Sequence, residues 1–171
     1  MSVEIQKKTG IKIAAVIITV LVLVVTLAIG ATQRLSGENM FAGTRPTNIG
    51  IQSEKLAACP GTPNCVNSQS LDAQSKIAPI AYNSTPTEAM TKLKTVIGDM
   101  ERTKIITETN NYLYAEFTSK LMGFVDDVEF LLDDNAKVIQ VRSASRLGQS
   151  DLGVNRKRIE EIRTKLNELQ A

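Results

Sequence analysis

Residues 124–145 read F-V-D-D-V-E-F-L-L-D-D-N-A-K-V-I-Q-V-R-S-A-S, a pattern that predicts a β-hairpin. Apolar and acidic side chains alternate over much of 124–132, as in a strand with one apolar and one polar face. The polar residues 133–135 connect this strand to a second one at 137–145. Because so short a connection cannot contain a parallel crossover, the two strands are expected to run antiparallel.

Two more strands are predicted before this hairpin, at 104–109 and 112–119, joined through Asn110 and Asn111. All the connections are short, so the four strands should form an antiparallel meander.

Helices are predicted on both sides of the meander in the sequence. Residues 85–88 (T-P-T-E) form a capping box with proline at the first helical position, and apolar residues follow at helical spacing as far as Met100. Residues 155–169 repeat apolar side chains at the same spacing and form a closing helix. The predicted fold class is therefore α+β, a four-stranded meander flanked by an N-terminal-side helix and a C-terminal helix.

One transmembrane helix is predicted ahead of this domain. Residues 13–31 carry no formal charge, and at about 1.5 Å per residue they can cross a hydrocarbon core of about 30 Å. Lys7, Lys8 and Lys12 precede the run, which favours a cytosolic amino terminus and export of the rest of the chain. The alternative is a cleaved signal peptide with a small-residue site at 28–30; it also exports the domain.

The chain then divides into four predicted parts. These are a cytosolic tail (1–12), a membrane anchor (13–31), an extended tether that could lie across the domain (32–56), and an exported domain (57–171).

The amino-acid composition excludes several classes of function. Of the 20 basic and 18 acidic residues, 17 of each remain after the anchor's basic flank and Glu4 are set aside, so the exported part is neutral. A neutral domain has no bulk electrostatic attraction for nucleic acid, and no nucleic-acid partner is predicted. The absence of histidine excludes a Ser-His-Asp or Cys-His nucleophile and any His-ligated zinc. No catalytic residue, metal or cofactor is assigned.

Five motifs resemble the domain-of-unknown-function family 1499 (DUF1499). They are R-P-T-N-I-G at 45–50, C-P-G-T-P-N-C-V-N-S-Q at 59–69, G-F-V-D-D-V-E-F at 123–130, R-S-A-S-R-L-G at 142–148 and S-D-L-G-V-N-R-K-R at 150–158. Asn67 departs from the serine that the family more often has. The resemblance implies a bacterial, cyanobacterial or plastid envelope or thylakoid protein, with the domain in the periplasm or thylakoid lumen. It implies no established activity.

Cys59 and Cys65 are the two cysteines of the chain. In an exported domain such a pair is expected to form a disulfide that acts as a structural staple. Two alternatives are a redox-active pair and ligation of a soft metal. A lipobox reading of 56–59 is disfavoured because many polar residues separate it from the apolar run.

The acidic residues of the predicted strand at 124–132 allow two interpretations. Depending on turn length, Arg142 lies opposite Asp127 or Glu129, and either register gives a cross-strand ion pair. The alternative is a hard-cation site formed by Asp126, Asp127 and Glu129.

The segment leading into the last helix is the candidate binding site. Basic side chains at a helix start oppose the helix dipole, so they need an acidic neighbour or an anionic ligand. The candidate binding residues are Arg142, Ser143, Ser145, Arg146, Asn155, Arg156 and Arg158. The competing interpretation is internal pairing with Asp126, Asp127, Asp151 or Glu160.

The expected function is that of a non-catalytic accessory or binding module, attached to the membrane through 13–31 and associated with a larger membrane protein complex. The alternative is a small-ligand or anion-binding protein that uses the Arg/Ser loop. An enzyme based on the cysteine pair or on carboxylates is the least favoured possibility.

Residues 121–123 (L-M-G) are an apolar hairpin tip that could contact lipid or a partner, or tuck under a helix.

Overall fold

The computed structural model describes residues 18–22, 24–25 and 41–169. Most of the predicted anchor (13–31) lies outside these ranges, and residues 18–22 and 24–25 are helical. Within the described ranges, no helix combines the length and the apolar character that crossing a membrane requires. The compact unit that carries the sheet begins at Phe41, so the later part of the predicted tether belongs to it.

Helix α2 (Pro86–Gly98) begins at the predicted capping box. The backbone N–H of Glu88 donates to Thr85 Oγ1 at 3.3 Å, and the backbone N–H of Thr85 donates to the Glu88 carboxylate at 3.1 Å. The apolar stripe of the helix is buried, with Leu93 and Ile97 fully so. The local sequence therefore predicted both the start and the buried face of this helix.

The four predicted strands are present as β3 (Thr103–Glu108), β4 (Tyr112–Thr118), β5 (Val125–Asp133) and β6 (Val138–Ser145). Each pairs antiparallel with the next along the chain, so the meander is confirmed.

The predicted count of four strands is wrong, because the sheet has six. Strands β1 (Cys65–Asn67) and β2 (Ile80–Ala81) both pair antiparallel with β6, and the sheet order is β1-β6-β5-β4-β3. These strands have three and two residues. Segments of that length carry no alternation that a sequence pattern can reveal, and their pairing depends on a distant β6.

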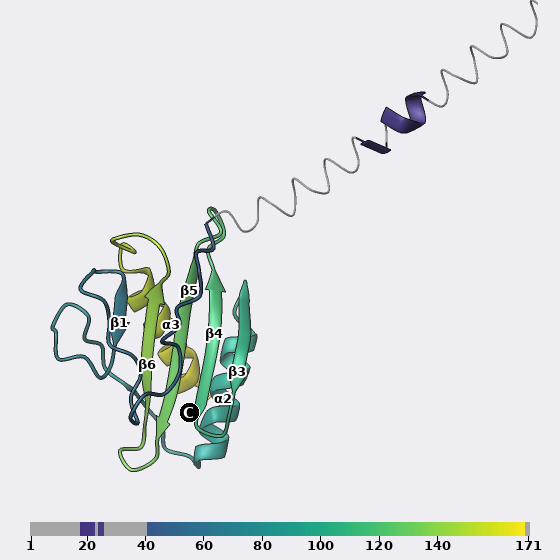
Figure 1. The fold of residues 1–171 in the computed structure, drawn as a ribbon. Helices are drawn as coiled ribbons and strands as arrows, with labels where there is room; N and C mark the ends of the chain where they lie inside the picture. The colour runs from purple at the N-terminus through teal and green to yellow at the C-terminus, as the bar shows by residue number, and fades with distance from the viewer. Residues whose placement is uncertain (1–17, 23, 26–40, 170–171) are drawn as a thin grey trace, which may run out of the picture. The chain divides into compact units, whose positions relative to one another are not determined.

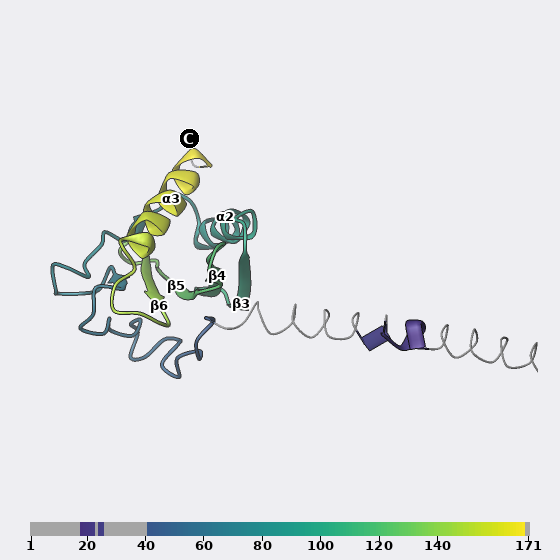
Figure 2. The same ribbon diagram turned by 90° about the horizontal axis from the view of Figure 1, so that it is seen from above.

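The sheet is covered differently on its two faces. Helices α2 and α3 (Val154–Glu168) pack on one face, as Figure 2 shows from above. Their buried residues, such as Ile97 and Ile159, share one apolar core with Val128 and Phe130 of β5. We call this side the helix face.

The opposite face is covered by the segment 41–57, which we call the strap (Figures 1 and 2). Leu56 of the strap is buried against Tyr112, Tyr114 and Leu131, and Ile49 packs on the same cluster. The strap contains no regular strand or helix, so side-chain contacts rather than a backbone ladder attach most of it to the sheet.

Candidate functional site

The residues predicted to form one binding site are divided between the two faces of the sheet. Neighbouring side chains of a strand point to opposite faces. Arg142 therefore lies on the strap face with Arg146, whereas Ser143 and Ser145 lie on the helix face, where they contact Asn155 of α3. The sheet itself thus separates two polar networks.

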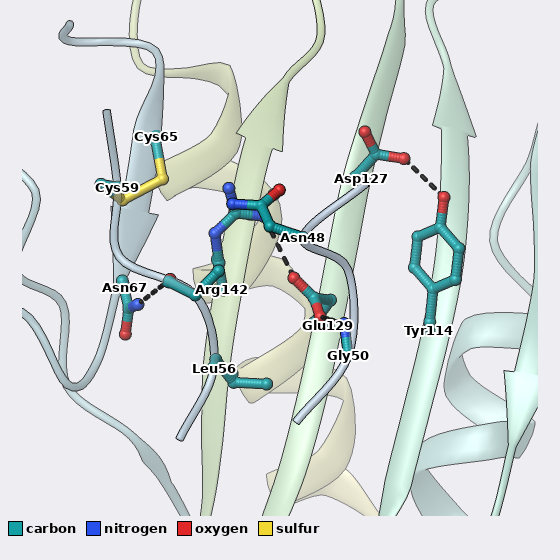
Figure 3. Close-up of polar contacts among 12 residues, drawn as sticks. Asn48, Gly50, Leu56, Cys59, Cys65, Asn67, Tyr114, Asp127, Glu129 and Arg142 are labelled. Atoms are coloured by element: carbon teal, nitrogen blue, oxygen red, sulfur yellow. Dashed lines mark hydrogen bonds and ion pairs between the residues drawn. A yellow bond between two sulfur atoms is a disulfide. The ribbon is translucent and has the colours of Figure 1, made fainter. Parts of the chain in front are cut away.

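Glu129 is the centre of the first network, on the strap face (Figure 3). Arg142 Nη1 donates to Glu129 Oε2 at 3.0 Å, while the hydroxyl of Tyr112 and the backbone N–H of Gly50 each donate to Oε1 at 2.8 Å. Glu129 is fully buried and Arg142 is 4% exposed. The cross-strand ion pair is confirmed, in the register with Arg142 opposite Glu129.

The guanidinium of Arg142 is not fully satisfied. Its Nε is buried and has no hydrogen-bond partner among residues 41–169. Gly50 reaches Glu129 with a φ of +116°, a backbone conformation that favours glycine. The strap therefore supplies a hydrogen bond to this network that a side chain at position 50 would strain.

Arg146 is the centre of a neighbouring cluster on the same face. Its Nε donates to Asp127 Oδ1 and Oδ2 at 3.1 and 3.0 Å, and its Nη2 pairs with Glu116. Tyr114 donates its hydroxyl proton to Asp127 at 2.6 Å. Arg45 of the strap donates to Glu116 at 2.8 Å from Nε and 2.5 Å from Nη2. Two strap contacts, at Arg45 and Gly50, thus tie it to the charged residues of the sheet.

These surroundings shift several pKa values. Burial raises the pKa of the Tyr112 hydroxyl, and the adjacent Glu129 charge raises it further. Burial and the hydrogen bond to Asp127 raise the pKa of Tyr114 in the same way. Burial alone would raise the pKa of Glu116, but the hydrogen bonds from the two arginines outweigh it and lower the pKa. The tyrosines therefore act as donors at neutral pH and Glu116 as an ionised acceptor.

Three members of these networks, Tyr112, Tyr114 and Glu116, were not identified from the sequence. Their signal was present, because every second residue of 112–116 (Y-L-Y-A-E) can hydrogen-bond through its side chain. The strap contacts had no comparable signal, since Gly50 and Glu129 are 79 residues apart.

Asn155 is the centre of the second network, on the helix face. Its Oδ1 accepts from Ser143 Oγ at 2.5 Å and from Arg158 Nη1 at 2.7 Å. Its Nδ2 donates to Ser145 Oγ and to the carbonyl of Asn64, both at 3.0 Å. Asn155 is fully buried, so all these groups connect α3, β6 and the segment before β1 inside the domain.

Arg158 joins this network to the acidic strand. Its Nη2 pairs with Asp126 Oδ2 at 2.5 Å, and its guanidinium carbon lies 4.9 Å from the centroid of the Phe117 ring. The charge of Arg158 is therefore paired within the domain, with Asp126, and that of Arg146 is paired with Asp127.

At the start of α3 the sequence allowed either an acidic neighbour or an anionic ligand. The structure has a carboxylate of the chain itself there. Asp151 accepts hydrogen bonds from the backbone N–H groups of Gly153 at 3.0 Å and Asn155 at 2.8 Å. Arg156 points elsewhere and donates to the carbonyl of Gln74 at 3.0 Å. Anion binding by the seven residues stays a prediction, and the structure does not bring them together.

The residues proposed for a hard-cation site are also divided. Asp126 contacts α3, whereas Asp127 and Glu129 face the strap, and each of the three pairs with a different arginine. In the part of the chain that the structure describes, no three His, Cys, Asp or Glu side chains converge on a possible metal position.

The predicted disulfide between Cys59 and Cys65 is confirmed, with a Cα–Cα distance of 5.7 Å. Cys65 belongs to β1 and pairs with Ala144 of β6. Just ahead of Cys59, the carbonyl of Ala57 accepts a hydrogen bond from Asn67 Nδ2 at 2.9 Å (Figure 3). The disulfide therefore fastens the end of the strap to the edge of the sheet.

The fold and these networks define an α+β domain in which a disulfide-fastened strap covers a charged sheet face. A family model described as a protein of unknown function (DUF1499) matches residues 55–166. The chain belongs to this family, as the resemblance of its motifs implied. No curated protein matches the chain.

Proposed function

We propose that this chain is an exported, membrane-anchored accessory module that binds a larger membrane protein complex. The observation that carries the proposal is a set of exposed large apolar side chains at one end of the sheet, which we call the apolar end. Its members are Leu121, Met122, Leu147 and Leu152, exposed by 91, 44, 42 and 95%.

The strand pairings bring these side chains to the same end. Leu121 and Met122 lie in the β4–β5 loop, and the other two lie between β6 and α3. The pairings of Thr118 with Val125 and of Asp126 with Ser145 put both loops beside each other. The strap also begins there (Figure 1). The ring of Phe41, its first residue, lies 5.4 Å from the ring of Phe124. Several exposed apolar side chains gathered in one place are typical of an interaction surface.

Three arginines of the candidate site form ion pairs within the domain. The guanidiniums of Arg142, Arg146 and Arg158 each pair with a buried or nearly buried carboxylate. The Arg158–Asp126 pair holds α3 against the sheet, and a separate pair, Arg45 with Glu116, holds the strap. What the apolar end offers a partner is accordingly hydrophobic contact, which favours binding over chemistry.

The disulfide supports the exported location. Disulfides persist in oxidising compartments and are rare in reducing ones. This agrees with the orientation that the lysines before residue 13 favour.

Gentle solubilisation of native membranes tests the proposal. The tagged full chain should co-purify with a larger complex, and Leu152→Ser should lose that complex because it removes the most exposed side chain of the apolar end. Leu71→Ser is the matched control, since Leu71 is 98% exposed but lies in the loop between β1 and β2. Loss of the complex in neither variant, or in both, would contradict the proposal.

A second candidate function is the binding of a small anionic ligand, favoured by a pocket of about 540 Å³ beside Arg158. Its lining includes Phe117 and four basic residues that could contact an anion, Arg102, Lys157, Arg158 and Lys165, together with four acidic residues, Asp99, Glu101, Asp126 and Glu161. Inorganic phosphate or citrate should then raise the melting temperature of the full chain, and Lys157→Ala should abolish the shift. An equal shift in both proteins would remove this candidate.

A further inference from the structure

We propose that the tip of the β4–β5 loop, Leu121 and Met122, inserts into the surface of the lipid bilayer on the exported side. This deepens the proposed function: it rests on attachment to the membrane, but it does not require the protein complex.

The loop is an ordered turn that holds its apolar side chains outward. The backbone N–H of Ser119 donates to the carbonyl of Phe124 at 2.8 Å, and the N–H of Phe124 donates to Ser119 Oγ at 3.0 Å. The N–H of Gly123 also donates to the carbonyl of Ser119, at 3.2 Å. Because these bonds already fix the backbone, insertion would cost little additional chain entropy.

The length of chain between the predicted anchor and the strap limits how far this loop can lie from lipid. Phe124 packs on Phe41, the first residue of the strap. Nine residues, 32–40, separate Phe41 from the end of the predicted anchor. Even fully extended, that connection spans at most about 35 Å. With the anchor retained, the ring pair that supports the tip can therefore lie no more than about 35 Å from the end of the membrane span.

The chemistry of the tip suits a lipid surface. Lys120 is the one charged residue of the sequence 119–124 (S-K-L-M-G-F) and is followed directly by the two apolar side chains. A lysine at such a position can extend its ammonium group to the headgroup phosphates while its neighbours enter the acyl region. Leu121 is 91% exposed, so this contact would cover a side chain that the domain leaves in water.

The absence of tryptophan from the chain gives a direct test. Leu121→Trp introduces a single indole at the tip, and the full chain can be reconstituted into phospholipid vesicles that contain no other protein. Vesicles made with acyl-chain-brominated lipid should quench most of its emission, relative to vesicles without bromine. Leu71→Trp is the matched control, because Leu71 is 98% exposed but lies in the loop between β1 and β2, and it should keep its emission. Met122→Trp repeats the test if the first variant does not fold, as judged by its circular dichroism.

Selective quenching at position 121 or 122 supports the proposal. Equal quenching at the tip and at position 71, or none at either, overturns it. The outcome is separable from that of the proposed function. Loss of the complex in Leu152→Ser without quenching at the tip would assign the apolar end to a protein alone. Quenching without any complex would leave lipid contact standing and remove the complex.

Discussion

Arg142 and Glu129 pair where almost no water reaches either group, and this makes the cost of losing one partner large. Arg142→Leu leaves the Glu129 carboxylate buried with its charge uncompensated, so we expect the free energy of unfolding to fall by about 3–5 kcal/mol. Urea denaturation at neutral pH measures this. Lys94→Ala is the control, because Lys94 and Glu108 form an exposed pair with side chains 51 and 44% accessible; its loss should cost less than about 1 kcal/mol. Similar losses in the two variants would contradict the burial argument.

The tyrosines give a pH-dependent prediction at the same scale. All three have a raised pKa in the folded protein, to about 12 for Tyr82, where burial and the hydrogen bond to Asp134 act together. A raised tyrosine pKa contributes stability that is complete below the unfolded value near 10 and is lost as the pH rises through the folded value.

Tyrosinate absorbance should therefore stay low in the native protein at pH 10 and rise only at higher pH, together with unfolding seen by circular dichroism. Half-titration near pH 10 with the fold intact would contradict the hydrogen-bonded arrangement of Tyr112 and Tyr114.

The attachment of the strap can be tested at the scale of one element. Gly43 has a φ of +65°, and a Cβ added there would lie 2.9 Å from Arg146 Cβ and 3.0 Å from Leu147 Cγ. Gly43→Ala should therefore push the strap away from the end of β6 and cost at least about 1–2 kcal/mol. Gly61→Ala has no atom within 4 Å of the added Cβ and should leave the unfolding free energy unchanged or slightly raised. A neutral Gly43→Ala variant would show that the strap is not closely packed there.

Elements with a strong local pattern could be predicted from the sequence, and those held by distant contacts could not. The capping box gave the start of α2, and alternation with short connections gave the meander. β1 and β2 are too short to show a period. The strap is fixed by pairs such as Arg45 with Glu116, which are 71 residues apart.

The arrangement of the candidate binding residues could also be predicted only in part. Alternation predicted that Arg142 would meet an acidic residue across the strand pair. It could also have separated Arg142 and Arg146 from Ser143 and Ser145, which point to the opposite face. The position of Asn155 between the two serines depends on how α3 packs, which no local pattern specifies.

At the scale of the whole molecule, the strap connects the disulfide with the apolar end. The strap crosses the charged face of the sheet, is fastened near β1 by the disulfide, and begins beside the β4–β5 loop at the apolar end. In the function that we propose, this end is the surface that meets the membrane or a partner within it.

Side-selective lysine labelling tests the exported location most directly. Sealed native membranes, prepared in both orientations, are treated with a membrane-impermeant amine reagent, and peptides carrying Lys104 and Lys7 are then compared by mass spectrometry. Lys104 lies in β3 and is exposed. We predict that Lys104 is labelled only when the exported side faces outward and Lys7 only when the cytosolic side does. Labelling of Lys104 from the cytosolic side of intact membranes would contradict the account.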